Sequence, residues 1–508
     1  MKKVLFLKKD LRFSFVLLFY YYYLICNQFI RILMNEFERL FNPNAVGIIG
    51  VNEKPYGGGF FLNCLESIGF DRPIYLFNPR LKGKIISGHK VYGSILEVEE
   101  NEQIDYAIIA VPAEKCPKIL QEVGEKKVPY ATIFSSGFSE VGKKDLEDQV
   151  LSIAKKYNLR IIGPNCLGVY NPKAKLSVSR WQTVDPGCFG LISQSGGLLI
   201  NITNTAIHSY STYISKAISI GNQIDLDVID FLKYFKEDTQ TKIIGLYLEN
   251  LKVKNPREGK EFIKLLKQIS MSGKPIILWK VGYGESAKEA ILSHTGGMAG
   301  SHKIWTDMAR QTGIILVKNT LELVSLAMAF KYIDFNKIER DKLGIIAVGG
   351  GTSIELTEQM ELNGLIIPTL SNHTKEQYQQ FLPAVNTIFK NPLDLGGNGL
   401  MPDVFAKSLI TLDDDPNISC VIFIKPYYLT KPFSDAIIKA KSQMKKPLVC
   451  ITPKIRDNLE DFRERIAFKK ALYTAGIPIF ESVDLASKAL RKLCEYKEFL
   501  DHFNHHPH

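Results

Sequence analysis

Short apolar stretches rich in valine and isoleucine alternate with amphipathic stretches along the chain from about residue 45 onward. Strands of a parallel sheet covered by helices on both faces are buried on both sides, and they therefore appear as continuous apolar runs. The pattern predicts an α/β protein in which three doubly wound units follow one another. The predicted strands are 45–51, 73–77, 106–111, 130–134 and 160–162 in the first set, 189–193, 216–219, 242–248, 275–280 and 314–317 in the second, and 343–348, 420–424, 448–451 and 477–480 in the third.

The stretches between these runs have a helical period. Leu146, Val150, Ile153 and Tyr157 recur at spacings of three or four residues, which predicts an amphipathic helix with one buried face and with its charges facing water. A polar stretch at 334–341 separates the second set of strands from the third. The predicted division is an N-terminal extension at 1–33, domains at 34–165, 166–335 and 342–495, and a tail at 496–508.

The first 33 residues have a different pattern from the rest of the chain. Six basic residues stand against the single acidic Asp10, and an apolar and aromatic run extends over 13–26. This run is shorter than the ~20 residues that span a bilayer as a helix, and no small-residue cleavage site follows it. We predict that the globular protein begins at Met34 and that the preceding residues lie outside the fold. A membrane-surface anchor and a signal peptide are the alternatives.

Composition narrows the class of protein. The 508 residues are 45% hydrophobic and 23% charged, enough for about three domains that each bury a core. The eight cysteines never form a C-x-x-C spacing, which argues against a zinc or iron–sulfur site and fits reduced thiols in the cytoplasm. The net charge of +11 arises from interleaved basic and acidic residues, so small anionic ligands explain it better than nucleic acid.

A glycine-rich loop at 50–59 follows the first predicted strand. Free N–H groups at the start of a helix attract anions, and glycine lets a phosphate approach the backbone. The loop is longer than the G-x-G-x-x-G of dinucleotide sites, and the second strand ends in Asn78-Pro79-Arg80 instead of an acidic residue that would hold an NAD ribose. NAD is therefore disfavoured. A nucleotide-bearing ligand with an extra phosphate fits, with Lys54 or Arg80 as counter-charge, and a plain glycine turn is the alternative.

Two further motifs could take part in phosphoryl transfer. One motif joins a buried strand to a helix and could hold a phosphoryl group: Ser193-Gln194-Ser195-Gly196-Gly197. An ordinary helix with a serine cap is the alternative, because it would have the same sequence pattern. His294 lies in a polar, glycine-rich loop at 293–301, where its Nε2 could attack phosphorus if another group fixes the tautomer. Glu249, at the end of a predicted strand, is the candidate for that group. An incidental loop histidine is the alternative.

Other chemistry is not supported by the sequence. No G-x-x-x-x-G-K-[ST] P-loop and no compact metal-ligand spacing occurs, so a self-contained nucleotide triphosphatase is disfavoured and no metal site is predicted. Cys166 has no histidine near it in sequence, and we predict that it packs as an inert thiol.

Taken in order, these motifs resemble the CoA-ligase (α) subunit of ADP-forming acyl-CoA synthetases, relatives of succinyl-CoA synthetase, over about residues 35–493. The loop at 349–355 lacks the aspartate that the family usually places after the glycines, which leaves the contacts of the third domain open. The motifs are Phe41-Asn42-Pro43, Gly50 with its glycine loop, Asn78-Pro79-Arg80, 135–140, 163–168, 193–197, 219–222, 293–296 and Asn391-Pro392-Leu393-Asp394.

The resemblance implies an N-terminal Rossmann-like CoA-binding domain followed by two flavodoxin-like, succinyl-CoA synthetase-like domains. It implies that His294 becomes phosphorylated, that Glu249 orients it, and that residues 193–197 receive the phosphoryl group. The implied CoA-binding residues are Gly50, Asn52, Lys54, Gly57, Gly58, Gly59, Asn78, Pro79, Arg80, Val111, Pro112, Ser135, Ser136, Gly137 and Asn165.

The resemblance also implies a partner. Nothing in the sequence resembles an ATP-grasp domain, so ADP or ATP and Mg²⁺ are expected on a β subunit in an α2β2-type hetero-oligomer. Together the subunits would interconvert acyl-CoA, ADP and phosphate with a carboxylic acid, ATP and CoA in the cytoplasm, without nucleic acid or membrane. A CoA-sensing regulatory module of the same fold and an NAD-dependent oxidoreductase are the rival functions.

Overall fold

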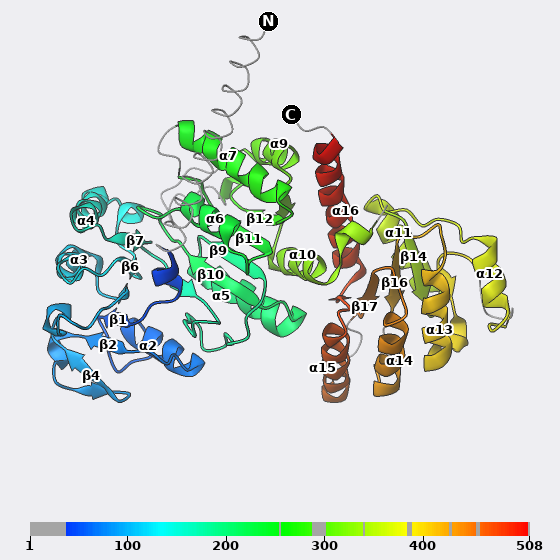
Figure 1. Cartoon of the computed structure of the whole chain (residues 1–508), viewed down its shortest axis with the longest axis horizontal. Coiled ribbons are helices and arrows are strands. Elements are labelled where there is room, and N and C mark those ends of the chain that lie inside the picture. The colour runs from blue at the N-terminus through cyan, green and yellow to red at the C-terminus, as the bar shows by residue number, and fades with distance from the viewer. Residues whose placement is uncertain are drawn as a thin grey trace, which may run out of the picture.

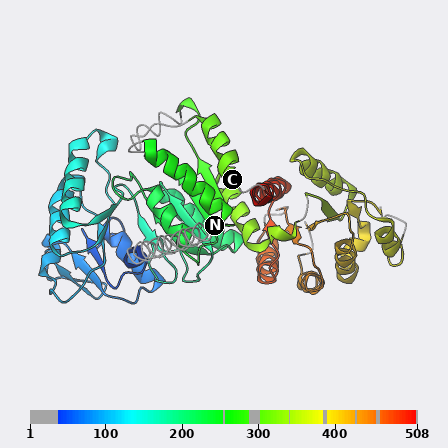
Figure 2. The same cartoon turned by 45° about the horizontal axis from the view of Figure 1, so that its top comes forward.

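The computed structural model describes residues 37–252, 256–286, 301–338, 341–383, 389–425, 429–453 and 458–505. Its described strands form three sheets of seven, six and five strands, one for each predicted set. The sheets follow one another along the molecule from the N-terminal domain, blue to cyan in Figure 1, through the green second domain to the yellow-to-red third domain, and the turned view of Figure 2 keeps this order. The predicted α/β fold of parallel sheets covered by helices is confirmed.

The first sheet has the order β3-β4-β2-β1-β5-β6-β7. β1 lies in register between β2 and β5, and all three strands are parallel. After β1 the chain adds strands first on the side of β2 and later on the side of β5, so the strand order reverses at β1. In an open α/β sheet such a switch point creates a crevice at the carboxyl ends of the strands. The elements are β1 (Val46–Ile49), α2 (Gly58–Ile68), β2 (Ile74–Phe77), β3 (Ile85–Ile86), β4 (His89–Tyr92), β5 (Tyr106–Ile109), α3 (Cys116–Glu125), β6 (Tyr130–Ile133), α4 (Lys144–Tyr157) and β7 (Arg160–Ile162).

Two features of this domain differ from the prediction. The antiparallel pair β3 and β4 was not predicted, because its strands are short and largely exposed and carry no apolar run. The charges of α4 do not all face water: Glu147 is only 4% exposed, and its Oε1 lies 3.5 Å from Lys144 Nζ. The buried positions Glu147, Val150 and Ala154 define a face slightly rotated from the predicted one.

The second sheet has the order β13-β12-β11-β9-β10-β8 and is parallel except for β8. The antiparallel β8 was not predicted, because Gly168-Val169-Tyr170 contains a single β-branched residue, and β10 starts two residues earlier than expected. The elements are β8 (Gly168–Tyr170), β9 (Phe189–Ser193), α5 (Gly196–Asn204), β10 (Ile214–Ser219), α6 (Val228–Glu237), β11 (Ile243–Leu248), α7 (Pro256–Met271), β12 (Ile276–Lys280), α9 (His302–Thr312), β13 (Ile315–Val317) and α10 (Thr320–Tyr332).

The third sheet has the order β15-β14-β16-β17-β18 and is parallel throughout. The two-residue β15 was not predicted, and residues 496–505 continue the last helix instead of forming a tail. The elements are β14 (Leu343–Ala347), α11 (Gly350–Leu362), α12 (Asn372–Gln379), β15 (Leu393–Asp394), α13 (Pro402–Asp413), β16 (Cys420–Ile424), α14 (Lys431–Lys441), β17 (Leu448–Ile451), α15 (Leu459–Thr474), β18 (Ile479–Phe480) and α16 (Val483–His505).

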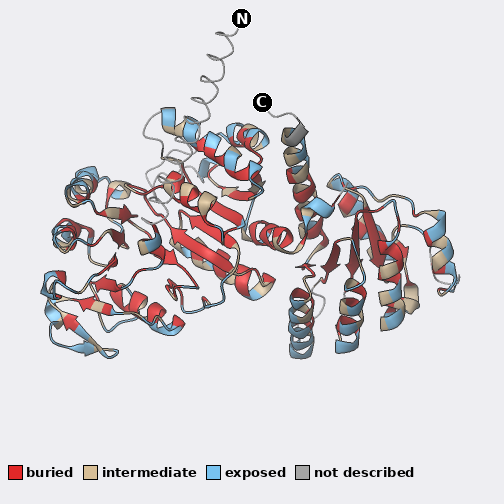
Figure 3. Ribbon diagram, viewed as in Figure 1, coloured by how far each residue is buried: buried red, intermediate tan, exposed pale blue. Residues whose placement is uncertain are grey.

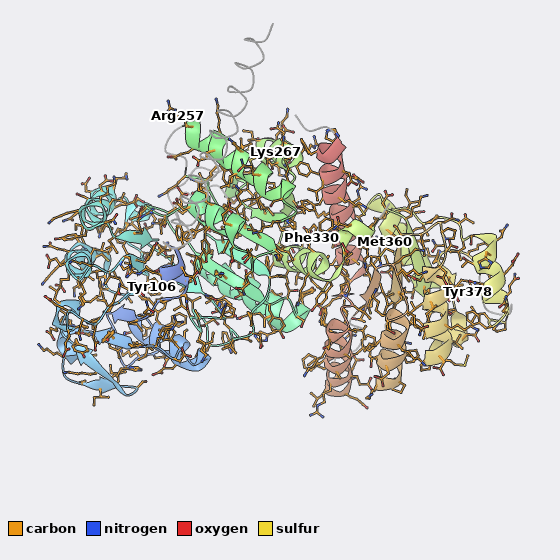
Figure 4. All side chains as sticks on the ribbon, viewed as in Figure 1. Tyr106, Arg257, Lys267, Phe330, Met360 and Tyr378 are labelled. Atoms are coloured by element: carbon orange, nitrogen blue, oxygen red, sulfur yellow. The ribbon has the colours of Figure 1, made fainter. Side chains whose placement is uncertain are left out.

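Aromatic side chains join the second and third domains. Phe330 on α10, labelled in Figure 4, packs edge-to-face on Tyr496 of α16 with ring centroids 5.4 Å apart. Tyr332 stacks on Tyr473 of α15 at 5.5 Å. The strands and the facing sides of the helices are buried in all three domains, as the red ribbon of Figure 3 shows. In the part of the chain that the structure describes, no helix is long and apolar enough to span a membrane.

Candidate functional site

At some glycines of the loop after β1 the fold leaves no room for a side chain. Gly50 has φ +91°, and a Cβ on it would lie 2.4 Å from the carbonyl oxygen of Ala110. A Cβ on Gly59 would lie 2.1 Å from the carbonyl oxygen of Lys54. The loop delivers the chain to the start of α2, where Gly57 precedes the helix and no side chain caps its N–H groups. These free donors at a helix N-terminus are an anion site.

A pocket of about 420 Å³ opens at the switch point of the first sheet. Asn78 shapes its rim: its Nδ2 donates to the carbonyl oxygen of Val51 at 2.7 Å, and its Oδ1 accepts the N–H of Arg80 at 3.0 Å. Arg80 is exposed and free to meet an anion at the mouth. Six predicted residues line the pocket: Gly50, Asn78, Pro79, Arg80, Val111 and Pro112.

Other predicted residues surround this pocket without lining it. Asn52 holds the glycine loop, because its Oδ1 accepts the N–H of Lys54 at 2.8 Å and its Nδ2 donates to the carbonyl oxygen of Tyr56 at 3.2 Å. Lys54 is exposed, with its amino group 5.8 Å from the centre of the Tyr56 ring. Gly57, Gly58 and Gly59 form the turn into α2.

The sequence reasoning missed part of the pocket wall. Ser94 Oγ donates to Glu122 Oε2 at 2.7 Å, which ties the segment after β4 to α3. Among the residues that were missed, only Lys115 could have been predicted from the sequence, because it is a basic residue shortly after Val111-Pro112 at the carboxyl end of β5. The missed lining residues include Gly93, Ser94, Ile95, Lys115, Ile119 and Glu122.

Residues 135–140 connect the first domain to the second. Ser135 donates its hydroxyl to the carbonyl of Val111, and its own carbonyl oxygen accepts the N–H of Asn165 at 3.0 Å. Gly137 donates its N–H to Glu140 Oε1 at 2.6 Å, while Glu140 Oε2 accepts from Asn222 Nδ2 at 2.7 Å. The exposed Ser136 lies between them. The edge of the pocket at the carboxyl ends of the strands is thereby fixed against the loop that follows β10.

The motif at residues 193–197 forms the N-terminus of α5. Ser195 Oγ caps the helix by accepting the N–H of Leu198 at 3.3 Å, and Ser193 Oγ donates to the carbonyl oxygen of Ser195 at 2.7 Å. A Cβ on Gly196 would come within 2.7 Å of Leu167, whereas a Cβ on the exposed Gly197 would meet nothing within 4 Å. The helix start is therefore fixed on one side and open on the other.

Gln194 connects this helix start to Glu249. Its Oε1 accepts the N–H of Glu249 at 2.9 Å and that of Asn250 at 3.1 Å. Its Nε2 is buried and has no hydrogen-bond partner among the described residues. Buried donors are normally satisfied, so this amide N–H group is suited to bind an oxygen of a ligand.

Glu249 follows β11 and is 6% exposed. Tyr247 donates its hydroxyl to Glu249 Oε1 at 3.4 Å, and burial together with the Glu249 charge raises the pKa of Tyr247, so the phenol remains a donor. Lys280 Nζ donates to the carbonyl oxygen of Glu249 at 2.8 Å. Because β9, β11 and β12 are parallel neighbours, Ser193, Glu249 and Lys280 meet at one edge of the second sheet.

His294 and the loop at 293–300 lie outside the described residues. The described segments on either side are β12, which ends at Lys280 beside Glu249, and α9, which begins at His302. The assignment of His294 remains a prediction from the sequence.

Cys166 is the remaining candidate nucleophile from the sequence, and it is buried. Burial raises the pKa of the Cys166 thiol to about 12, which keeps it protonated and unreactive at neutral pH. Among the described residues no three histidine, cysteine, aspartate or glutamate side chains are grouped so that they could hold a metal ion.

Family models match two of the three domains. One described as a CoA binding domain matches residues 44–172, which contain the glycine loop and its pocket. One described as a succinyl-CoA ligase like flavodoxin domain matches residues 186–330, which contain Gln194, Glu249 and Lys280. The pocket therefore lies within a region that matches a CoA binding domain, and Glu249 lies within a region that matches a succinyl-CoA ligase like flavodoxin domain.

Similar proteins cover more of the chain. The α subunit of ADP-forming acetate–CoA ligase I of Pyrococcus furiosus is 32% identical over 472 residues, which are 91% of this chain and 98% of that protein. The ADP-forming acetate–CoA ligase of Methanocaldococcus jannaschii is 37% identical over 366 residues, but the chain spans only 49% of its length.

Solved structures agree with these relatives. The dinucleotide-forming acetyl-CoA synthetase 1 of Ca. Korarchaeum cryptofilum, determined with phosphate and ADP, superposes with a TM-score of 0.79 at 27% identity, covering 93% of this chain and 99% of that chain. Since the likeness in sequence and in fold extends over nearly the whole of a named α subunit, the chain belongs to the α-subunit family of the ADP-forming acetate–CoA ligases, which are acid–thiol ligases.

Proposed function

We propose that this chain is the α subunit of an ADP-forming acyl-CoA synthetase. With an ATP-grasp β subunit it interconverts acyl-CoA, ADP and phosphate with a carboxylic acid, ATP and CoA. The observation that carries the proposal is the link made by Gln194, which holds Glu249 beside the N-terminus of α5 in a domain attached to a CoA-type pocket. A protein that only sensed CoA would have no use for this second site.

CoA is assigned to the pocket of the first domain. The start of α2 and the exposed Lys54 and Arg80 supply donors and positive charge for its phosphates. We assign the thiol end to the side of Val111 and Ser135, because Ser135 binds Asn165 of the segment 163–168 and Leu167 of that segment contacts the start of α5. The thioester would then lie near the phosphoryl site.

The reaction divides into three balanced steps. Phosphate attacks the thioester carbonyl, the C–S bond breaks, and CoA leaves as a thiol after taking a proton. His294 Nε2 attacks the phosphorus of the acyl phosphate, the P–O bond breaks, and the carboxylate leaves. A terminal phosphate oxygen of ADP then attacks the phosphohistidine, and the P–N bond breaks to give ATP and free histidine.

The described residues have separate roles in these steps. The N–H groups at the start of α5 and the Gln194 amide bind the phosphoryl oxygens, whose negative charge the helix dipole favours. Glu249 holds the imidazole Nδ1 proton and so directs Nε2 toward phosphorus. We assign the nucleotide and its Mg²⁺ to the β subunit.

The partner and the location are part of the same proposal. Relatives named α subunits imply a second subunit, and the longer Methanocaldococcus relative carries a further half beyond the matched region. We propose an α2β2-type assembly. The seven cysteines of the described chain are all free thiols, which supports a reducing cytoplasm.

The test uses the purified chain with and without a co-expressed β subunit. Alone, the chain should bind CoA and convert acetyl-CoA and labelled phosphate into acetyl phosphate, but it should make no ATP from ADP. Addition of the β subunit should restore ATP synthesis. CoA binding without acyl phosphate would favour the regulatory module, and steady ATP formation by the single chain would refute the division between subunits.

Replacing Gly59 with alanine is expected to weaken CoA binding roughly a hundredfold. The new Cβ would lie 2.1 Å from the Lys54 carbonyl oxygen, so the loop must open and about two charge-assisted hydrogen bonds to phosphate are lost. Gly351→Ala is the matched control, because a Cβ there meets nothing within 4 Å. Calorimetric titration with CoA measures the affinity of each variant. Equal affinity in the two variants would contradict the assignment of CoA to this pocket.

A further inference from the structure

Lys280 is a buried lysine that the proposed mechanism does not use. It is the last residue of β12 and is 4% exposed. Its amino group lies 5.6 Å from the centre of the Trp305 ring and 5.5 Å from that of Tyr283, so aromatic faces enclose it. Burying an ammonium group is costly unless its charge is compensated, so a lysine in this place calls for a specific contact.

The contacts of Lys280 are made to the backbone. Its Nζ donates to the carbonyl oxygen of Glu249 at 2.8 Å and to the carbonyl of Val281. Burial lowers the pKa of Lys280 to about 8, although the charge of Glu249 opposes the shift. The ammonium group therefore joins the ends of two neighbouring strands, β11 and β12.

Glu249 is consequently held on both sides of its α-carbon. Gln194 Oε1 accepts its N–H at 2.9 Å, and Lys280 Nζ binds its carbonyl oxygen at 2.8 Å. The two peptide planes that flank a residue fix the direction of its Cα–Cβ bond. Gln194 lies directly before Ser195, the N-cap of α5. The contact from Gln194 therefore sets the distance between Glu249 and the helix, and the contact from Lys280 sets the orientation of Glu249.

We propose that Lys280 is a positioning residue for phosphoryl transfer, which holds the backbone of Glu249 so that its carboxylate is fixed relative to the N-terminus of α5. The inference rests on the proposed role of Glu249 in orienting the phosphorylated histidine. A misplacement of about 1 Å at a catalytic group can cost on the order of a hundredfold in rate. Loss of this clamp should therefore slow the transfer without disturbing the CoA pocket, which lies in the first domain.

The experiment replaces Lys280 with methionine in the α subunit of the assembled αβ enzyme. Methionine keeps the length and the aromatic contacts of the side chain but donates no hydrogen bond. Phosphoenzyme formation from acetyl phosphate should slow about tenfold to a hundredfold, while the KM for CoA changes less than about twofold. Lys280→Arg, which keeps a cationic donor, should recover most of the rate. If the methionine variant does not fold, Lys280→Gln replaces it, and its rate should lie between those of the wild type and Glu249→Gln.

Lys274, two residues before the start of β12, offers a matched control. It lies just before β12, at the opposite edge of the sheet, and its Nζ donates to the carbonyl oxygens of Phe235, Lys236 and Asp238 at 2.9, 2.7 and 2.8 Å. Lys274→Met also removes a lysine bound to backbone carbonyls, so it should lower the thermal unfolding temperature, yet it should leave the rate of phosphoenzyme formation unchanged.

The outcomes separate this inference from the proposed function. Equal slowing in Lys280→Met and Lys274→Met, in proportion to lost stability, would show a structural role only and would overturn the inference. Normal transfer in Lys280→Met beside defective transfer in Glu249→Gln would overturn it as well, while the role of Glu249 stands. Normal transfer in Glu249→Gln would overturn both, because Lys280 would then have no catalytic group to position.

Discussion

Replacing His294 with alanine is expected to abolish the phosphoenzyme and to reduce ATP formation by about a thousandfold or more, because the proposed reaction passes the phosphoryl group to ADP through this histidine. CoA affinity should stay unchanged, since the proposed CoA pocket lies in the first domain and is built from other residues. Acetyl phosphate formation from acetyl-CoA and phosphate should remain measurable, because that step precedes the histidine.

The measurement is mass spectrometry of the enzyme at neutral or alkaline pH, where phosphohistidine survives. His302 provides the control: it begins α9, and its ring packs on Tyr283 with centroids 4.6 Å apart. His302→Ala should keep the phosphoenzyme. A stable phosphate on a residue other than His294 in the wild-type enzyme would remove the basis for the assignment.

Replacing Lys216 with methionine should destabilise the protein by about 3–5 kcal/mol, a large part of the stability of an ordinary domain. Lys216 Nζ lies 3.0 Å from Asp238 Oδ2, with both side chains 8% exposed. Removal of the lysine leaves a buried carboxylate that keeps only its bonds from Thr241 and Gln240. Urea denaturation measures the loss, and Asp238→Asn added to the same chain should recover much of it.

An exposed ion pair in the same domain serves as the comparison for the buried Lys216–Asp238 pair. Lys233 Nζ lies 2.7 Å from Glu261 Oε1, with side chains 41% and 49% exposed, so Lys233→Met should cost no more than about 1 kcal/mol. A similar loss in both variants would argue against a special role for burial.

Acid should weaken the same region. Burial alone raises the pKa of Asp238, but the Thr241 hydroxyl and the Lys216 ammonium outweigh it and hold that pKa below its usual value. The carboxylate is therefore stabilising above the pKa of the unfolded chain, and this contribution disappears as the pH falls through the lower pKa of the folded state. Asp238→Asn should flatten that part of the stability profile.

The alternation of apolar and amphipathic stretches was enough to predict three parallel sheets, because a strand buried on both faces needs apolar residues at every position. Runs such as Ile243–Leu248 and Cys420–Ile424 are buried throughout and could be read directly. The motifs after the strands were also readable, because carboxyl ends of parallel strands share one edge. Six of the predicted CoA-binding residues line one pocket for that reason.

The tertiary structure decided what depends on distant neighbours. The short strands β3, β8 and β15 each pair with an adjacent strand, and their two or three residues are too few to show a strand pattern in the sequence. Residues 496–505 remain helical because α16 packs on the second domain, where Tyr496 donates its hydroxyl to the carbonyl oxygen of Ser270 at 2.7 Å.

In the candidate site, too, the sequence indicates individual residues and only the tertiary structure shows how they are connected. Gln194 and Glu249 could each be selected as polar residues at strand ends, but they are 55 residues apart, and no local pattern says that one side chain binds the backbone of the other. Lys280 gave no signal at all, since a lysine at the end of an apolar run is expected to reach water. Its amino group instead binds backbone carbonyls beside Trp305 and Tyr283, because α9 and the segment after β12 bury it.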